Sequence, residues 1–130
     1  MKLYRYMSNR EFAALTSGVP LVYRKGTHKS RTGSEGFCFL GETTEMNGMS
    51  YTPEECYTFL CGIVTSDVLV EMEIDNPALV SESWGVYAVP DGAWEDCDTI
   101  TEYCTMQYNR DTFRPLRYAV GGKWYDYNRG

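Results

Sequence analysis

Short apolar segments separated by polar, glycine-rich stretches run through most of this chain, and this pattern favours strands over helices. Residues 2–7 are predicted to form a first strand. Residues 68–74 alternate apolar and acidic side chains, which predicts a half-buried strand with Glu71 and Glu73 on its wet face. The other expected strands are 21–23, 36–40, 84–89, 103–108, 116–120 and 123–127, with Gly121-Gly122 as the turn between the last two.

A first helix is predicted over residues 9–17. Ser8 is typical of a residue that caps a helix at its amino end, and Glu11, three residues later, completes a capping box. Gly18 then stops the helix in the left-handed conformation that glycine adopts without strain.

A second helix is predicted from Thr52 as its cap to an end at Gly62, with Pro53 in the first helical position and Glu55 in the third. Two early helices followed by a run of strands indicate a strand-dominated α+β fold. At 130 residues and without a linker or repeat, residues 1–130 are expected to form a single domain.

The charge balance argues against a nucleic-acid partner. The formal net charge is -6, and the short basic stretch from Arg24 to Arg31 is the only local positive cluster in the sequence. An acidic chain repels phosphate backbones, and a basic loop is usually a solvated segment.

Neither a membrane anchor nor a metal site is expected. The opening residues do not resemble a signal peptide, and no apolar run approaches the roughly 20 residues that cross a bilayer, so we expect a cytoplasmic protein. The five cysteines include no C-x-x-C pair and His28 is the only histidine, so a zinc site is disfavoured and the cysteines are interpreted as small buried hydrophobes. Their odd number also argues against a disulfide framework.

The opening strand with Arg5, followed by a short helix and a glycine-bounded turn into a strand, resembles the start of cholera-toxin-type ADP-ribosyltransferases. The resemblance is best over residues 2–26 and weaker through the later order of elements. It implies a compact split β-sandwich of short, mostly antiparallel strands with two early helices. It also implies NAD as a substrate.

The resemblance assigns roles to particular residues. Breaking the nicotinamide–ribose bond builds positive charge on the ribose, and a facing carboxylate lowers that barrier. Glu102 is the candidate catalytic carboxylate. Arg5 would grip a phosphate or ribose oxygen with two parallel hydrogen bonds. Tyr6 and Phe37 would stack on nicotinamide, and Cys38 belongs to the same cofactor-binding set.

Two departures from the family pattern leave two functions open. The expected serine is missing from the strand that contains Cys38, and Ile100 stands two residues before Glu102, where arginine-modifying members have a second acid. The first hypothesis is a mono-ADP-ribosyltransferase acting on an acceptor other than arginine. The second is a catalytically inactive relative, of bacterial, phage or mobile-element type, that binds an ADP-ribose-like nucleotide or inhibits a partner protein.

Overall fold

The computed structural model describes residues 1–24, 36–46, 49–55, 68–86 and 99–127. Over these residues the fold is mixed α+β with antiparallel strand pairing, which confirms the predicted class. Most of the basic stretch, including His28, and the body of the predicted second helix lie outside the described residues.

One sheet has four strands in the order β1-β6-β10-β11. β6 lies between β1 and β10, so both of its edges are hydrogen-bonded. The β10–β11 hairpin turns at Gly121-Gly122, both with positive φ, as predicted. The strands of this sheet are β1 (Lys2–Met7), β6 (Val68–Glu73), β10 (Arg114–Val120) and β11 (Lys123–Asp126).

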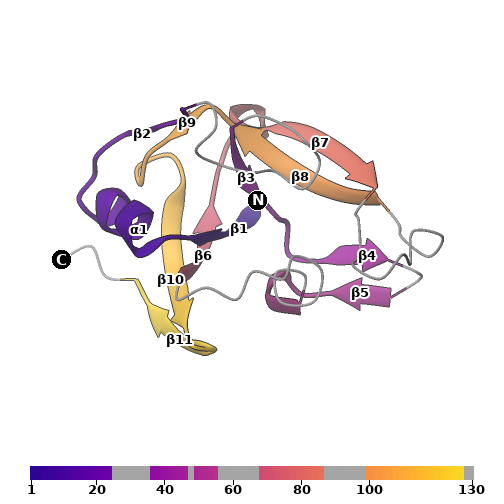
Figure 1. Cartoon of the computed structure of the whole chain (residues 1–130). Coiled ribbons are helices and arrows are strands. Elements are labelled where there is room, and N and C mark those ends of the chain that lie inside the picture. The colour runs from indigo at the N-terminus through magenta and orange to yellow at the C-terminus, as the bar shows by residue number, and fades with distance from the viewer. Residues whose placement is uncertain (25–35, 47–48, 56–67, 87–98, 128–130) are drawn as a thin grey trace.

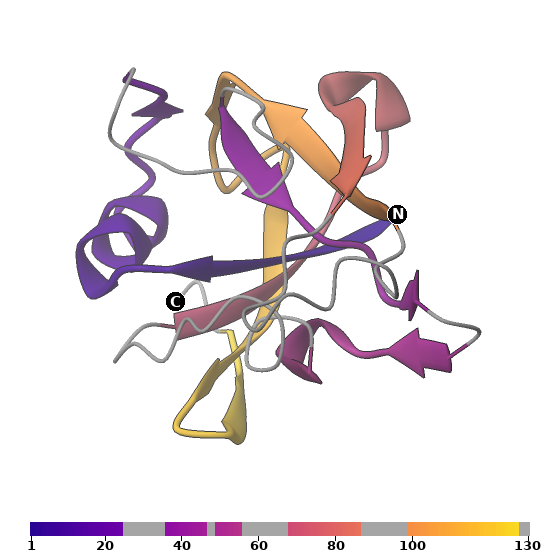
Figure 2. The ribbon, with the colours of Figure 1, turned by 45° about the vertical axis from the view of Figure 1, so that its right-hand side comes forward.

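A second sheet has three strands in the order β3-β8-β7, and two further strand pairs, β2-β9 and β4-β5, complete the described strands. In Figures 1 and 2 this sheet lies over the four-stranded sheet, with the helix that follows β1 at one end and the β4–β5 hairpin at the other. Its strands and the paired strands are β2 (Leu21–Val22), β3 (Phe37–Phe39), β4 (Thr44–Met46), β5 (Met49–Tyr51), β7 (Ser81–Val86), β8 (Thr99–Thr105) and β9 (Gln107–Tyr108).

The helix signals in the sequence are confirmed where the structure describes them. The helix α1 spans Asn9–Thr16, and the Ser8 hydroxyl accepts a hydrogen bond from the Glu11 amide. Gly18 follows with φ +77°. At the second start, Thr52 and Glu55 exchange the two hydrogen bonds of a capping box, and residues 53–55 are helical. A short 3₁₀ turn, η1 (Pro77–Leu79), follows β6.

The hydrophobic core lies between the two sheets. It takes Leu3 and Met7 from β1, valines and a methionine from β6, and aromatic rings from the other sheet and its neighbours. The rings of Phe39, Tyr108 and Phe113 meet edge to face or tilted, with centroids 5.3 to 5.5 Å apart. A single apolar layer therefore joins both sheets.

Several strand predictions need correction. β7 begins at Ser81, before the predicted start at residue 84, and β4 and β5 lie where no strand is predicted. The predicted strand 103–108 divides at Met106, because β8 pairs with β3 and β7 whereas β9 pairs with β2. The interpretation of Glu71 as part of a wet face is wrong: its exposed fraction is 4%, because β6 is a central strand with both faces covered.

Gly36→Ala is expected to destabilise the fold by at least about 2 kcal/mol. Gly36 has φ +112°, and an added Cβ would lie 2.7 Å from the Thr105 carbonyl oxygen. Gly41→Ala is the matched control, since its added Cβ would meet only a Tyr103 ring carbon at 3.5 Å. Urea unfolding of both variants measures the difference, and equal midpoints would contradict the expectation.

Candidate functional site

The inner face of β1 contains a buried arginine that is held by three elements. The Arg5 Nε and Nη2 atoms donate to the two carboxylate oxygens of Glu11 on α1, at 2.7 and 2.9 Å. The Nη1 atom donates to the Cys38 carbonyl oxygen on β3 at 3.0 Å. The Tyr108 hydroxyl donates to the same Glu11 carboxylate at 2.6 Å. Arg5 thereby ties β1, α1, β3 and β9 together.

This network lies away from solvent. Arg5 is 9% exposed and Glu11 8% exposed. Burial, followed by the charge of Glu11, raises the pKa of Tyr108 well above its ordinary value, so the phenol stays protonated and remains a donor. Removing one partner of such a buried pair would leave an unpaired charge in the interior, so the pair couples the elements that supply its atoms. The guanidinium faces protein partners where the expected site required it to face a nucleotide.

The other predicted cofactor-binding residues divide between two faces of β1 and β3. Phe37 lies beneath the Arg5 guanidinium and is 1% exposed. The guanidinium carbon of Arg5 is 5.2 Å from the centroid of the Phe37 ring. Cys38 contributes its carbonyl oxygen, but its thiol points to the opposite face of β3, toward Cys104. Tyr6 follows Arg5 directly, so it points away from the Arg5 side of the sheet.

Glu102, the predicted catalytic carboxylate, is fully buried on β8. It stands two residues from Cys104, and the Cys104 sulfur lies 3.2 Å from that of Cys38, so all three side chains share one face of the second sheet. The Arg5 guanidinium lies on the other face, over the rings of Phe37 and Phe39. The structure therefore brings Arg5 and Phe37 together but does not place Glu102 in the same groove.

A second polar cluster occupies the outer face of the four-stranded sheet. Tyr4, Glu71 and Arg117 stand side by side on β1, β6 and β10. The Tyr4 hydroxyl donates to Glu71 Oε2 at 2.6 Å, and Arg117 Nη2 donates to the same oxygen at 3.0 Å. Arg117 also covers the ring of Trp124 on β11, with its guanidinium carbon 4.2 Å from the ring centroid.

The ionisation of this cluster follows from its contacts. Burial alone would raise the pKa of Glu71, but the hydrogen bonds from Arg117 and Tyr4 outweigh it and hold that pKa below its ordinary value. Burial, with the neighbouring carboxylate, raises the pKa of Tyr4. The hydrogen bond to Glu71 raises the pKa of Arg117. At neutral pH the cluster is an ion pair with a neutral phenol.

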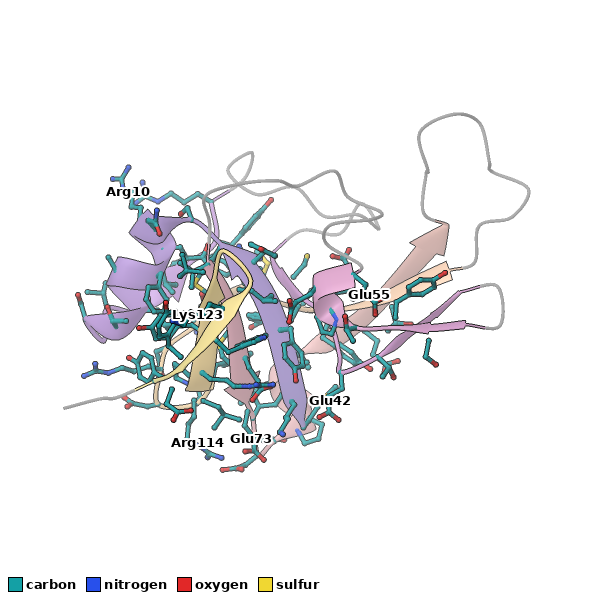
Figure 3. All side chains as sticks on the ribbon, turned by 90° about the horizontal axis from the view of Figure 1, so that it is seen from below. Arg10, Glu42, Glu55, Glu73, Arg114 and Lys123 are labelled. Carbon is teal, nitrogen blue, oxygen red and sulfur yellow. The ribbon has the colours of Figure 1, made fainter. Side chains whose placement is uncertain are left out.

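The outer cluster forms one wall of a cleft of about 220 Å³. The start of the second helix closes the cleft from the other side, where Glu54 accepts a hydrogen bond from Trp124 Nε1 at 2.9 Å. Glu42 lines it as well, with 61% of its side chain exposed. Figure 3 shows this side of the molecule from below, with Glu42 and Glu55 labelled near β1 and Lys123 on the β10–β11 hairpin. The lining residues are Tyr4, Glu42, Thr52, Pro53, Glu54, Leu69, Arg117 and Trp124.

A larger cavity of about 450 Å³ lies beside β9, and its described lining contains no charged side chain. The Asn109 side-chain oxygen there already accepts from the amides of Asp111 and Thr112. A dinucleotide needs positive charge or backbone donors at its phosphates, and the described lining of this cavity supplies no positively charged side chain. The lining residues are Pro20, Ala78, Leu79, Thr105, Gln107, Tyr108, Asn109, Thr112 and Phe113.

The sequence contained only one clue to the outer cluster. Glu71 is an acid on an alternating strand, whereas Tyr4, Arg117 and Trp124 belong to no motif of the outer cluster. Their meeting depends on strand pairing between segments 46 to 67 positions apart. The alternation of the late strand 116–120 could have placed Arg117 on one face, but not opposite Glu71.

Comparisons with family models, with curated proteins and with solved structures found no match to this chain. The described residues contain no group of three or more His, Cys, Asp and Glu side chains that could hold a metal ion. Within the same part of the chain, no helix is long and apolar enough to cross a membrane.

Arg5→Met is expected to lower the free energy of unfolding by about 3–5 kcal/mol, because it leaves the Glu11 carboxylate buried without its cation. Arg10→Met is the control, since Arg10 is exposed at the start of the same helix, and it should change stability by no more than about 0.5 kcal/mol. Urea unfolding measures both. The double variant Arg5→Met, Glu11→Leu should cost less than the sum of the two single changes. Unchanged stability in Arg5→Met would contradict the structural role.

Glu71→Gln is expected to cost about 1–3 kcal/mol at neutral pH, because Arg117 and Tyr4 lose a charged acceptor. The folded-state pKa of Glu71 is lowered, so its stabilising contribution is present above the ordinary carboxyl pKa and is lost as the pH falls through the folded value.

We therefore expect the difference in the free energy of unfolding between the native chain and Glu71→Gln, measured from pH 7 downward, to become smaller below about pH 4.5. Glu73→Gln is the matched control, because Glu73 lies on the same strand but is half-exposed. A difference in the free energy of unfolding that stays constant down to pH 3 would refute the stabilising role of the ionised Glu71 carboxylate.

Proposed function

We propose that this chain is a non-catalytic binding protein that captures a basic side chain of a partner protein in the outer cleft. The observation that carries the proposal is the composition of that cleft, where Glu42 and Glu54 line a small space beside apolar and aromatic walls. The proposal develops the second of the two hypotheses drawn from the sequence.

The size of the cleft favours a side chain as its occupant. Pockets for whole small molecules and cofactors usually measure about 300–1,000 Å³, and this cleft is smaller, at about 220 Å³. Trp124, which also lines the cleft and is partly exposed, supplies apolar surface for the methylene stem of a lysine or arginine. The charged end of such a side chain would then reach the carboxylates at the opening.

The charges of the cleft favour a cation. Arg117 is already paired with Glu71, so its charge is matched within the wall. Lys2 lies 3.9 Å from Glu42 on the exposed surface, where such a contact contributes little. The carboxylates of Glu42 and Glu54 therefore leave the opening negative. A net charge of -6 over the whole chain adds long-range attraction for a basic partner.

The inner face offers less to a transferase. ADP-ribosyl transfer needs a carboxylate and an anchoring cation that face the same ribose. Arg5 is engaged by Glu11 and the Cys38 carbonyl, and Glu102 lies on the other face of the second sheet. This arrangement favours binding without turnover.

The experiment is a titration followed by two-dimensional NMR, with the Trp124 indole N–H as reporter. Trp124→Phe identifies its resonance among the three tryptophans. A short peptide of alternating arginine and glycine should shift this resonance at low salt, and the same peptide with glutamate in place of arginine should not. Glu42→Gln with Glu54→Gln should weaken binding at least about tenfold, a loss of about 1.4 kcal/mol.

The control pair is Asp75→Asn with Glu82→Gln, which removes the same charge from exposed positions outside the cleft. It should leave the affinity within about twofold. Equal weakening in both pairs would mean general charge attraction and would refute the cleft as the site. Nicotinamide release from NAD that disappears in Glu102→Gln would instead establish the transferase.

A further inference from the structure

The second sheet contains a pair of thiols in contact. Cys38 on β3 and Cys104 on β8 are directly opposite partners, and their sulfur atoms are 3.2 Å apart. Both are nearly buried, at 5% and 7% exposure. Neither takes part in the cleft on the outer face of the other sheet.

We propose that Cys38 and Cys104 are a reversible oxidation site that closes to a cross-strand disulfide when the chain meets a peroxide. Opposite residues of an antiparallel pair have Cα atoms about 4.5–5.5 Å apart, which falls within the range that a disulfide spans. The side chains already point toward each other, so the bond forms without a change of register.

The chemistry balances with hydrogen peroxide as the oxidant. One thiolate attacks a peroxide oxygen, the O–O bond breaks, and a sulfenic acid and hydroxide form. The second thiol then attacks the sulfenic sulfur and displaces its oxygen, which leaves as water. In total two thiols and one peroxide give one disulfide and two water molecules. The adjacent second thiol acts as the resolving cysteine and prevents further oxidation of the first.

Oxidation would cross-link β3 and β8 and stabilise the folded chain. The disulfide would join positions 66 apart in the sequence, and closing so long a loop restricts the unfolded chain. The melting temperature should rise by roughly 10 °C. Cys38 also supplies the carbonyl oxygen that holds Arg5, so the bond would brace the strand on which the inner ion pair depends.

The first test maps the bond in the native chain. The protein is treated with one equivalent of hydrogen peroxide, unfolded in N-ethylmaleimide, digested without reductant and analysed by mass spectrometry. We expect a Cys38–Cys104 linked peptide that dithiothreitol separates. Alkylation of both thiols, or linkage only through Cys56, Cys61 or Cys97, would overturn the proposal.

The second test uses variants. In Cys38→Ser the rise in melting temperature should disappear, and the remaining Cys104 sulfenic acid should be trapped by dimedone. Cys97→Ser leaves the proposed pair intact and should keep the whole rise. A peroxide-induced rise that survives in Cys38→Ser, or that is lost in Cys97→Ser, would contradict the assignment.

Discussion

The buried ion pair between Arg5 and Glu11 is the constraint on which the described structure depends. A charge taken out of water must be paired and hydrogen-bonded, and here the partners come from the helix, from Tyr108 and from the Cys38 carbonyl. Four elements therefore have to assemble together around one guanidinium. This also sets the direction of Arg5, whose side chain faces the core between the two sheets.

The direction of Arg5 decides what its neighbours on β1 can do. Side chains alternate along a strand, so Tyr4 and Tyr6 point to the outer face. On that face Tyr4 meets Glu71 and Arg117, and the cleft forms beside them. A six-residue strand thus contributes both to the ion pair that stabilises the interior and to the wall of the proposed binding site.

The same alternation separates the chemistry of the second sheet. Phe37 faces the guanidinium, whereas the Cys38 thiol, Cys104 and Glu102 occupy the opposite face. The ion pair thus lies between the two sheets, the outer cleft lies on the far side of the four-stranded sheet, and the thiol pair lies on the far side of the second sheet. Binding at the cleft and oxidation at the thiols are expected to be independent, apart from the brace that Cys38 provides to Arg5.

The sequence by itself determined the local structure: the caps at Ser8 and Thr52, the left-handed stop at Gly18, the glycine hairpin and most strands. Each of these signals lies within a few adjacent residues, and the backbone conformation that those residues favour does not depend on their tertiary surroundings. Only the tertiary structure decided which face of each strand is buried and which side chains become hydrogen-bond partners. Glu11 and Tyr108 are 97 positions apart, and a shift of strand register by one residue exchanges the two faces. Side-chain partners at that separation depend on register, and no local pattern encodes it.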